Sequence, residues 1–362
     1  MSGYFDYNAT APFRDEARSA WEEAGRRYWQ NPSGLYRSAA GARRRLEDAR
    51  EALADVFDAG PERVVFTSGA TEANNAVMRH AALAGGRALI GATEHPCVRA
   101  AARRWFGEVV ETRGEQGAGA AVEGFALVSL MAANNETGAL LPWRGLRDRC
   151  RAAGVPFHCD AAQWIGKLPV DGLGACDYLT GSAHKFGGPR GAGFVLVPEG
   201  ASEFALQVGG PQENGLRAGT EDVAGAVGMV AALEAAIAGA PGDPGGRDRF
   251  ERELVAAIPG TRVIGAEGDR LWNTSMVLVP AEKNLKWLTR LDARGFQVST
   301  GSACSAGREN PSHVMEAEGL AYDEMGRVIR VSGGWDTRHQ DWRALLDAFV
   351  QVAQELGTPG TD

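Results

Sequence analysis

Hydrophobic residues in the first two thirds of the chain form short continuous runs, separated by amphipathic stretches. The runs cover residues 63–67, 87–90, 125–131 and 155–159. Continuous runs without alternation are typical of strands that are buried on both faces, as in a parallel sheet. Between them, residues 43–57 repeat apolar side chains on one helical face and carry Arg and Glu on the other. This alternation predicts an α/β domain with a mostly parallel sheet.

A segment rich in Gly and Pro, residues 238–246, predicts a connection between two domains because it suits neither a helix nor a central strand. Beyond it we expect a helix and then strands at 273–279 and 328–332, which indicates a smaller α+β domain. We therefore expect a large domain over residues 13–240 and a small domain formed by 1–12 and 247–362. A length of 362 residues favours this division, since single cores stop growing at roughly 250–300 residues.

The composition is that of an ordinary globular protein, with 44% hydrophobic and 23% charged residues. A formal net charge of −8 argues against direct nucleic-acid binding, which needs a basic surface. The chain has no run of about 18 apolar residues that would span a membrane, and its start does not resemble a signal peptide. Its five dispersed cysteines form no CxxC pair, so we expect a cytoplasmic protein without disulfides and without a metal site.

Several polar segments directly follow the predicted strands, where sites form in open α/β sheets. Residues 67–72 make a turn of small residues that opens a helix, so free N–H groups and the helix dipole could hold a phosphate. The alternative is a simple helix cap by Ser68 or Thr71. His95 follows the second run and Asn135 lies in Asn-Asn-Glu-Thr-Gly, but a lone His is more often structural and the second segment could be only a turn.

Asp160 and Lys185 form the most informative pair. Asp160 ends a buried run, where a carboxylate is costly unless a cation or ligand compensates its charge. Lys185 follows residues 177–180, and a Lys near a buried strand end is a candidate Schiff-base amine because desolvation lowers its pKa. The order Asp then Lys, on neighbouring strands, suits pyridoxal phosphate. The Lys holds the aldehyde while the Asp keeps the pyridine nitrogen protonated.

Two loops complete the set of candidate segments. Residues 212–220 are polar and contain glycine, so they could add phosphate contacts. Residues 299–307 place Cys304 among small, turn-forming residues, which predicts an exposed, mobile thiol. The other cysteines lie in apolar or helical surroundings, and we interpret them as buried residues without a role: Cys97, Cys150, Cys159 and Cys176.

In order and spacing, these motifs resemble the cysteine desulfurases of the class V aminotransferase group, which have pyridoxal-phosphate fold type I. The resemblance also covers residues 6–12, 31–33 and 329–332, so it runs nearly from end to end. Ser-Ala-Cys-Ser around Cys304 resembles the branch with the longer catalytic loop, here about residues 299–313. The resemblance implies a large domain with a mostly parallel, seven-stranded type of sheet between helices. It also implies a smaller α+β domain that carries the catalytic loop.

The resemblance further implies pyridoxal 5′-phosphate as cofactor and L-cysteine as substrate. Lys185 would hold the cofactor and remove the Cα proton, His95 would stack on the ring and take part in proton transfer, and Cys304 would be the sulfur-accepting nucleophile. Thr220 would reach the phosphate of the other subunit in a homodimer. The remaining implied contacts are Asp160 and Gln163 to the ring, Ala70, Thr71, Ser182 and His184 to the phosphate, and Asn135 and Arg330 to the substrate carboxylate.

Three positions depart from the family pattern. Pro211 replaces a Gly, Tyr36 stands where the family has His, and Gly333-Gly334-Trp335 replaces a Gly-Arg pair. These departures concern the cofactor entrance or the substrate side, so they bear on substrate tuning and partner choice.

The function we expect is conversion of L-cysteine to L-alanine, with the sulfur transferred to Cys304 as a persulfide and delivered to an acceptor protein. The alternative is a pyridoxal-phosphate-dependent cysteine or selenocysteine lyase that releases inorganic product. A third hypothesis is a scaffold that delivers sulfur within a complex, whereas an aminotransferase would have no use for a mobile loop Cys. The acceptor stays open between iron–sulfur cluster assembly, tRNA thiolation, cofactor sulfuration and DNA sulfur modification.

Overall fold

The computed structural model describes residues 3–113, 119–205, 207–239, 242–301 and 312–358. The chain divides into two compact units. The large unit contains Pro12–Ala132 and Leu141–Ala240, and the small unit contains Met1–Ala11, Ala133–Leu140 and Pro241–Asp362.

The large unit is built on a seven-stranded sheet with the order β1-β7-β6-β5-β4-β2-β3. Its strands are β1 (Val64–Thr67), β2 (Arg87–Gly91), β3 (Glu108–Thr112), β4 (Leu127–Ser129), β5 (Phe157–Asp160), β6 (Tyr178–Ser182) and β7 (Gly193–Leu196). Neighbours from β6 to β3 pair in parallel, while β7 is antiparallel to both β1 and β6. The direction of β1 is therefore that of β6. The prediction of a mostly parallel sheet is confirmed.

All four runs interpreted as strands are confirmed, as β1, β2, β4 and β5. The edge strand β3 was not predicted, because its side chains are half-buried or exposed and include two Glu and one Thr. The helix expected over residues 43–57 is α2 (Arg37–Val56), which begins earlier than the apolar pattern.

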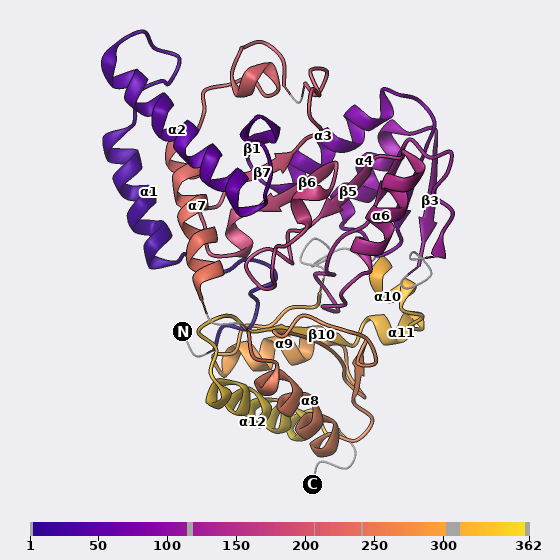
Figure 1. Ribbon diagram of the computed structural model, residues 1–362. Helices are drawn as coiled ribbons and strands as arrows, with labels where there is room; N and C mark the ends of the chain where they lie inside the picture. Colours follow the sequence, from indigo (N-terminus) through magenta and orange to yellow (C-terminus); the bar gives the residue numbers. More distant parts are fainter. Residues whose placement is uncertain (1–2, 114–118, 206, 240–241, 302–311, 359–362) are drawn as a thin grey trace. The chain divides into compact units, whose positions relative to one another are not determined.

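Helices cover the sheet of the large unit (Figure 1). They are α1 (Asp15–Arg27), α2, α3 (Ala70–Ala82), α4 (Pro96–Trp105), α6 (Trp143–Ala153) and α7 (Val223–Ala238), with short 3₁₀ turns η1 (Pro61–Arg63), η2 (Leu173–Ala175), η3 (Ala183–Lys185) and η4 (Glu213–Gly215). Both α1 and α2 pack on α7, which explains why α7 is apolar around most of its surface.

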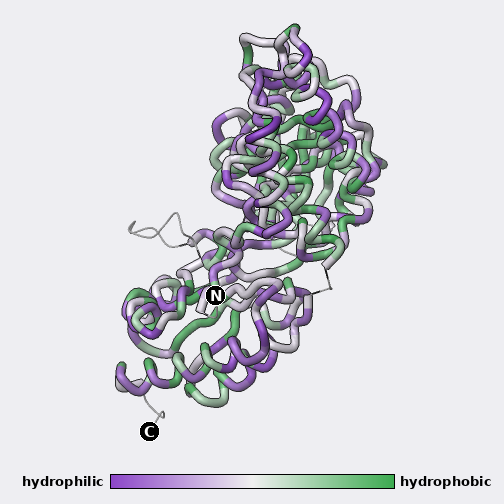
Figure 2. The backbone as a smooth tube through the Cα atoms, turned by 90° about the vertical axis from the view of Figure 1, so that its left-hand side faces the viewer, coloured by the Kyte–Doolittle hydropathy of each residue, from purple (hydrophilic) through white to green (hydrophobic). Residues whose placement is uncertain are grey.

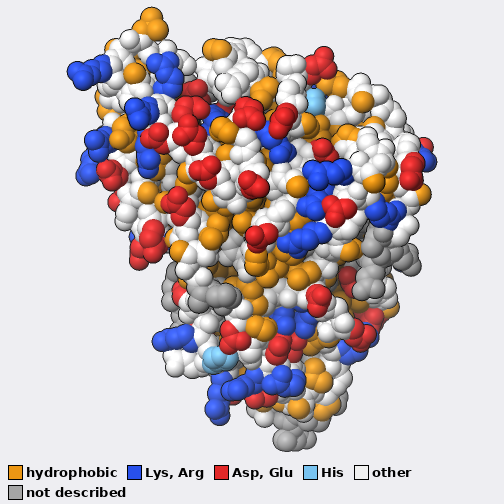
Figure 3. Space-filling model, viewed as in Figure 1, with side chains coloured by type: hydrophobic (Ala, Val, Ile, Leu, Met, Phe, Trp, Pro, Cys, Tyr) orange, Lys and Arg blue, Asp and Glu red, His pale blue; other side chains and the backbone are white. Residues whose placement is uncertain are grey.

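The core of the large unit lies between the sheet and α3 and α4. Val65, Val77, Ile90, Leu127 and Val195 are fully buried there. Figure 2 shows hydrophobic segments of the backbone running through the interior of this unit. On the visible face of the unit, basic and acidic side chains are interspersed (Figure 3).

The small unit packs helices on a three-stranded antiparallel sheet with the order β10-β9-β8. Its elements are β8 (Arg262–Ile264), β9 (Thr274–Leu278), β10 (Val328–Ser332), α8 (Gly245–Ala257), α9 (Asn284–Ala293), α10 (His313–Ala317), α11 (Tyr322–Met325) and α12 (His339–Glu355). Its core includes Phe250, Trp287, Ile329 and Phe349, all essentially inaccessible. The predicted strands 273–279 and 328–332 are confirmed as β9 and β10.

Two boundaries differ from those expected. Residues 133–140 belong to the small unit, because Ala139 bridges to Arg270 and the N–H of Leu140 donates to the carbonyl of Asp269. The segment 238–246 is also not wholly a connection, since α8 already begins at Gly245. A Cβ on Gly246 would lie 2.6 Å from the Trp342 ring, so the absence of a side chain allows the two helices to approach. In the described ranges, no helix is both long and apolar enough to cross a membrane.

Candidate active site

Three of the predicted polar residues of the large unit interact electrostatically at the carboxyl ends of the strands. Asp160 ends β5 and pairs in register with Thr180 of the neighbouring β6, and Lys185 ends the turn that follows β6. Burial lowers the pKa of His95, the charge of Lys185 lowers it further, and Asp160 opposes the shift. The structure therefore brings Asp160, Lys185 and His95 together.

Asp160 is a buried carboxylate held by neutral donors. Its side chain accepts hydrogen bonds from Nδ2 of Asn74 at 2.7 Å and from the backbone N–H of Ala162 at 3.0 Å, and the residue is only 5% exposed. Among the described residues, no Lys or Arg forms an ion pair with it. A buried anion with neutral partners alone is costly, so this position suits a cationic ligand group such as a protonated pyridine nitrogen.

A buried polar network fixes the Asn74 side chain. Oδ1 of Asn74 accepts from Oγ1 of Thr180 at 2.6 Å, Thr180 contacts Nε2 of His158 at 3.2 Å, and Nδ1 of His158 contacts Ser129 at 2.8 Å. Burial lowers the pKa of His158 to about 4, so this ring is neutral. The network was not expected from the sequence. Its signal in the sequence was polar residues inside apolar runs, such as Ser129 and His158. The structure shows that these two residues are in register on adjacent strands.

The turn after β1 leaves helix N–H groups available. Gly69 is the N-cap of α3 at φ +148°, and among the described residues no side chain caps the helix. The N–H groups of Ala70 and Thr71, in the first turn, have no intrahelical acceptor. The alternative of a cap by Ser68 or Thr71 is therefore wrong.

The turn is packed closely against β6 and β7. A Cβ on Gly193 would lie 2.5 Å from Cα of Gly69, and a Cβ on Gly69 would lie 3.3 Å from Oγ of Ser182. Ser182 is thus brought to the turn, as predicted for a phosphate contact. His184 is half-buried two residues later, and burial together with nearby cations lowers its pKa to about 4.

Two ion pairs hold the loop 212–220, one to the helix that follows this turn and one to α2. Glu72 accepts from the backbone N–H of Ser68 at 2.6 Å and pairs with Nε of Arg217 at 3.0 Å. These contacts outweigh the effect of burial and lower the pKa of Glu72.

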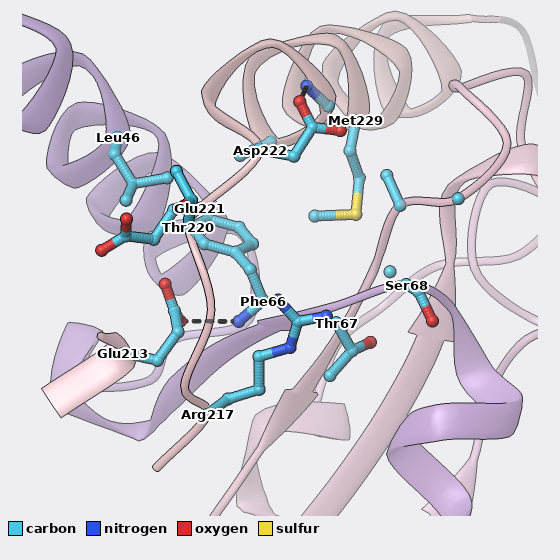
Figure 4. Close-up of a pocket in the computed structure, with 15 residues that line it drawn as sticks. Leu46, Phe66, Thr67, Ser68, Glu213, Arg217, Thr220, Glu221, Asp222 and Met229 are labelled. Carbon is cyan, nitrogen blue, oxygen red and sulfur yellow. Dashed lines mark hydrogen bonds between the residues drawn. The ribbon is translucent and has the colours of Figure 1, made fainter. Parts of the chain in front are cut away.

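The second pair is buried. Glu213 receives two hydrogen bonds of 2.8 Å from Arg50. It also receives one of 2.8 Å from the backbone N–H of Phe66, which is the dashed line in Figure 4. The loop bounds a cavity of about 200 Å³ whose lining includes Thr67, Ser68 and Thr220. Thr220 is exposed at this cavity.

The interpretation of four cysteines as buried residues without a role has to be corrected for Cys97. Cys150, Cys159 and Cys176 are buried, but Cys97 is half-buried and its Sγ lies 3.0 Å from Nδ1 of His95. Burial and the nearby Asp160 raise the pKa of the Cys97 thiol to about 12.

Glu94 and Gln163 are two further buried polar residues of this region. Glu94, which was not among the predicted site residues, is fully buried and accepts from the backbone N–H of Met131 at 2.6 Å. Its pKa is raised well above the usual range by burial and by Asp160. Oε1 of Gln163 accepts from Nζ of Lys167 at 2.6 Å.

In the small unit, the guanidinium of Arg330 is buried and held by three oxygens. Nη1 donates to the carbonyls of Asn135 at 2.9 Å and Gly301 at 2.8 Å, and Nη2 donates to Asp6 at 2.6 Å. Nε is also buried, and within the described part of the chain it has no hydrogen-bond partner. The buried Nε–H of Arg330 thus suits an acceptor from a ligand.

Cys304 lies within residues 302–311, outside the described residues. Both flanks of that segment are held near Asn135. Gly301 accepts from Nη1 of Arg330, which also donates to Asn135, and Oγ of Ser312 donates to Glu136 at 2.6 Å.

The structure shows the surroundings of two of the positions that depart from the family pattern. A Cβ on Gly334 would lie 1.9 Å from the Tyr7 ring, and Tyr7 packs edge-on against Trp335 at 5.4 Å between centroids. This aromatic pair therefore accounts for glycine at position 334. Tyr36 is the exposed N-cap of α2.

Comparison with known proteins agrees with this arrangement. Residues 3–345 match the class-V aminotransferase family. The chain belongs to this family. It is 36% identical to a cysteine desulfurase of Cereibacter sphaeroides, over 98% of this chain and 96% of the relative. Enzymes of the family depend on pyridoxal phosphate.

Solved structures give the same result for the fold. A NifS-like protein superposes with a TM-score of 0.85 at 28% identity, covering 99% of this chain and all of that one. SspA in complex with cysteine superposes with a TM-score of 0.77 at 28% identity, covering 91% and 98% of the two chains. The predicted fold class and family are confirmed.

The residues of the large unit fit pyridoxal phosphate. Asp160 offers a buried anion without a cationic partner among the described residues, and the uncapped start of α3 offers N–H groups to a phosphate. Lys185 follows the strand next to the one that Asp160 ends.

Proposed function

We propose that this protein is a pyridoxal-phosphate-dependent cysteine desulfurase that converts L-cysteine to L-alanine and transfers the sulfur to Cys304. The observation that carries the proposal is the buried Asp160 at the end of β5, beside the strand that leads to Lys185. In the described part of the chain, this carboxylate accepts hydrogen bonds from neutral donors only. The family, with relatives that are cysteine desulfurases, supports the same activity.

Bound pyridoxal phosphate would supply an aldehyde for the amino group and a ring that withdraws electrons from Cα. In this proposal Lys185 holds the cofactor and moves the Cα proton, and Asp160 keeps the ring nitrogen protonated. His95 stacks on the ring and takes part in proton transfer. The remaining cofactor contacts are assigned to Gln163 for the ring hydroxyl and to Ala70, Thr71, Ser182 and His184 for the phosphate.

We assign the substrate carboxylate to Arg330 and Asn135. Asp6 and two carbonyls hold the guanidinium in place, and the buried Nε remains to donate to a carboxylate. Charge-assisted hydrogen bonds from Arg to a carboxylate are strong and directional, which suits this role. The similar SspA structure is a complex with cysteine, which supports an amino-acid substrate here.

Cys304 is assigned as the sulfur acceptor. Its thiolate would form a bond to the substrate sulfur while the C–S bond breaks. The carbon keeps the electron pair of that bond and takes up a proton, which gives alanine. The persulfide on Cys304 would then be passed to an acceptor protein. Iron–sulfur cluster assembly is one such destination.

We further propose a cytoplasmic homodimer in which Thr220 reaches the cofactor phosphate of the other subunit. The exposure of Thr220 on a loop held by two ion pairs supports a contact that lies outside its own chain. Dispersed cysteines support a reducing compartment.

Product analysis tests the proposal. The holoenzyme incubated with L-cysteine should form alanine and sulfur in equal amounts, whereas pyruvate would identify a β-eliminating lyase and overturn it. Turnover of selenocysteine with release of selenide, at rates far above those with cysteine, would favour the selenocysteine lyase. Activity that stays negligible until a protein partner is added would favour the scaffold hypothesis.

A further inference from the structure

Cys97 lies between two side chains of the candidate site. Its Sγ is 3.0 Å from Nδ1 of His95, and on the other side Nδ2 of Asn74 donates to the same sulfur at 3.3 Å. The same Nδ2 of Asn74 donates to Asp160 at 2.7 Å. A continuous chain of hydrogen bonds therefore runs from Asp160 through Asn74 and Cys97 to His95.

The direction of these bonds follows from the donors. Nδ1 of His95 accepts the backbone N–H of Cys97 at 3.3 Å, so Nδ1 carries no proton. A neutral imidazole with a bare Nδ1 has its proton on Nε2. Asn74 donates to the sulfur, and the side-chain hydrogen bond of Thr71 also lowers the pKa of the thiol, as a donor to the sulfur does. Nδ1 of His95, 3.0 Å from Sγ, is therefore the acceptor to which the S–H proton of Cys97 is directed. The pKa of the thiol is raised to about 12, so the thiol keeps this proton at neutral pH.

We infer that Cys97 is a positioning residue for His95, whose thiol, oriented by Asn74, donates to Nδ1 and holds the imidazole neutral with its proton on Nε2. Within the described residues, both hydrogen-bonded contacts of the ring use Nδ1, so Nε2 stays available to a ligand. The inference rests on the proposed function in one respect: the proposed function gives His95 a part in proton transfer.

Several groups face His95 from the elements around it. Asp160 of β5 favours the protonated ring, while Lys185 of η3 and burial disfavour it. Glu94 and Cys97 lie in the same segment of the chain as His95, and the pKa values of both side chains are raised. Hydrogen bonds donated to the neutral ring disfavour its protonation, so removal of the thiol should raise the pKa of His95.

The test follows the His95 ring by ¹H–¹⁵N NMR in the cofactor-free protein, with its signal assigned through His95→Gln. Cys97→Ala should raise the titration midpoint of His95 by about 0.5–1 pH unit, the equivalent of one lost neutral hydrogen bond. Cys97→Ser retains a donor and should keep the wild-type midpoint. Cys150→Ala, which removes a buried thiol of α6, is the matched control and should leave the midpoint unchanged.

Activity gives the second measurement. In the holoenzyme, the acid limb of the kcat/KM profile should move to higher pH in Cys97→Ala and not in Cys97→Ser. An unchanged His95 midpoint in Cys97→Ala, or an equal shift in Cys97→Ser, overturns the inference. If the protein does not desulfurate cysteine, the NMR titration still decides the role of Cys97, so the two failures are distinguishable.

Discussion

Nη1 of Arg330 donates to the backbone carbonyl of Asn135 at 2.9 Å, and the two residues belong to the same compact unit. They are 195 positions apart in the chain. Nδ2 of Asn8 donates to the same carbonyl at 3.2 Å, so the segment that carries Asn135 is held from two sides. Both residues were assigned to the substrate carboxylate from the sequence, and their direct contact makes a shared role physically reasonable.

Replacement of Arg330 tests that role. Arg330→Ala should lower kcat/KM for L-cysteine by the equivalent of about 2–4 kcal/mol and raise KM, because a charged hydrogen-bonded pair is lost. Steady-state kinetics measures both quantities. Arg327→Ala is the matched control, since Arg327 donates to the carbonyls of Val279 and Pro280. An unchanged kcat/KM in Arg330→Ala would make Arg330 a structural residue of β10.

The cofactor lysine can be identified chemically. The purified protein should be yellow, and reduction with borohydride followed by peptide mapping should place the pyridoxyl group on Lys185. Its position after β6, next to the strand that ends in Asp160, is the physical reason. Lys167 and Lys286 are the internal controls. A pyridoxyl group on either of them would refute the assignment.

Mixing of variants tests the shared site. If Thr220 contacts the phosphate in the other subunit, a Lys185→Ala chain combined with a Thr220→Ala chain should regain one intact site per heterodimer. Activity is measured after subunit exchange, with heterodimer formation checked by differently tagged chains. Each variant mixed with itself is the control. Heterodimers that form without recovering activity would contradict a shared site.

The role of Cys304 separates sulfur transfer from elimination. Cys304→Ser should remain yellow and bind cysteine but form almost no alanine and no persulfide, because the acceptor sulfur is missing. Sulfide and alanine are measured with and without an added reductant, and Cys176→Ser, a buried cysteine outside the proposed site, is the control. A lyase would release sulfide at a near-normal rate in the variant, and that result would make Cys304 a bystander.

His158 should make stability depend on pH. Its pKa is lowered by burial from 6.5 to about 4, so protonation favours the unfolded chain. The stabilisation is fully present above about pH 6.5 and is lost as the pH falls toward about 4, with a total of about 3 kcal/mol.

Denaturant unfolding of the holoenzyme across this range measures that dependence. His158→Asn should flatten it, whereas replacement of the exposed His339 should not. An equally steep loss of stability in His158→Asn would show that other groups dominate acid unfolding.

Much of the candidate site was predictable because it follows a local rule. Asp160 ends a buried apolar strand, and Lys185 and His95 lie within four residues of the end of one; such positions meet at one edge of a parallel sheet. The network of Asn74, Thr180, His158 and Ser129 was not predicted. Each of these residues is an ordinary polar residue in the sequence, and only the register of neighbouring strands joins them.

The sequence by itself determined the buried strands β1, β2, β4, β5, β9 and β10 and the helix α2, because continuous apolar runs and 3.6-residue periodicity are local properties. It also determined the family, since the order of motifs survives at 36% identity. The tertiary structure alone decided that residues 133–140 join the small unit and that Asn74 contacts both Cys97 and Asp160. Those outcomes depend on hydrogen bonds and packing between distant or turning segments, whose geometry exists only once the chain has folded.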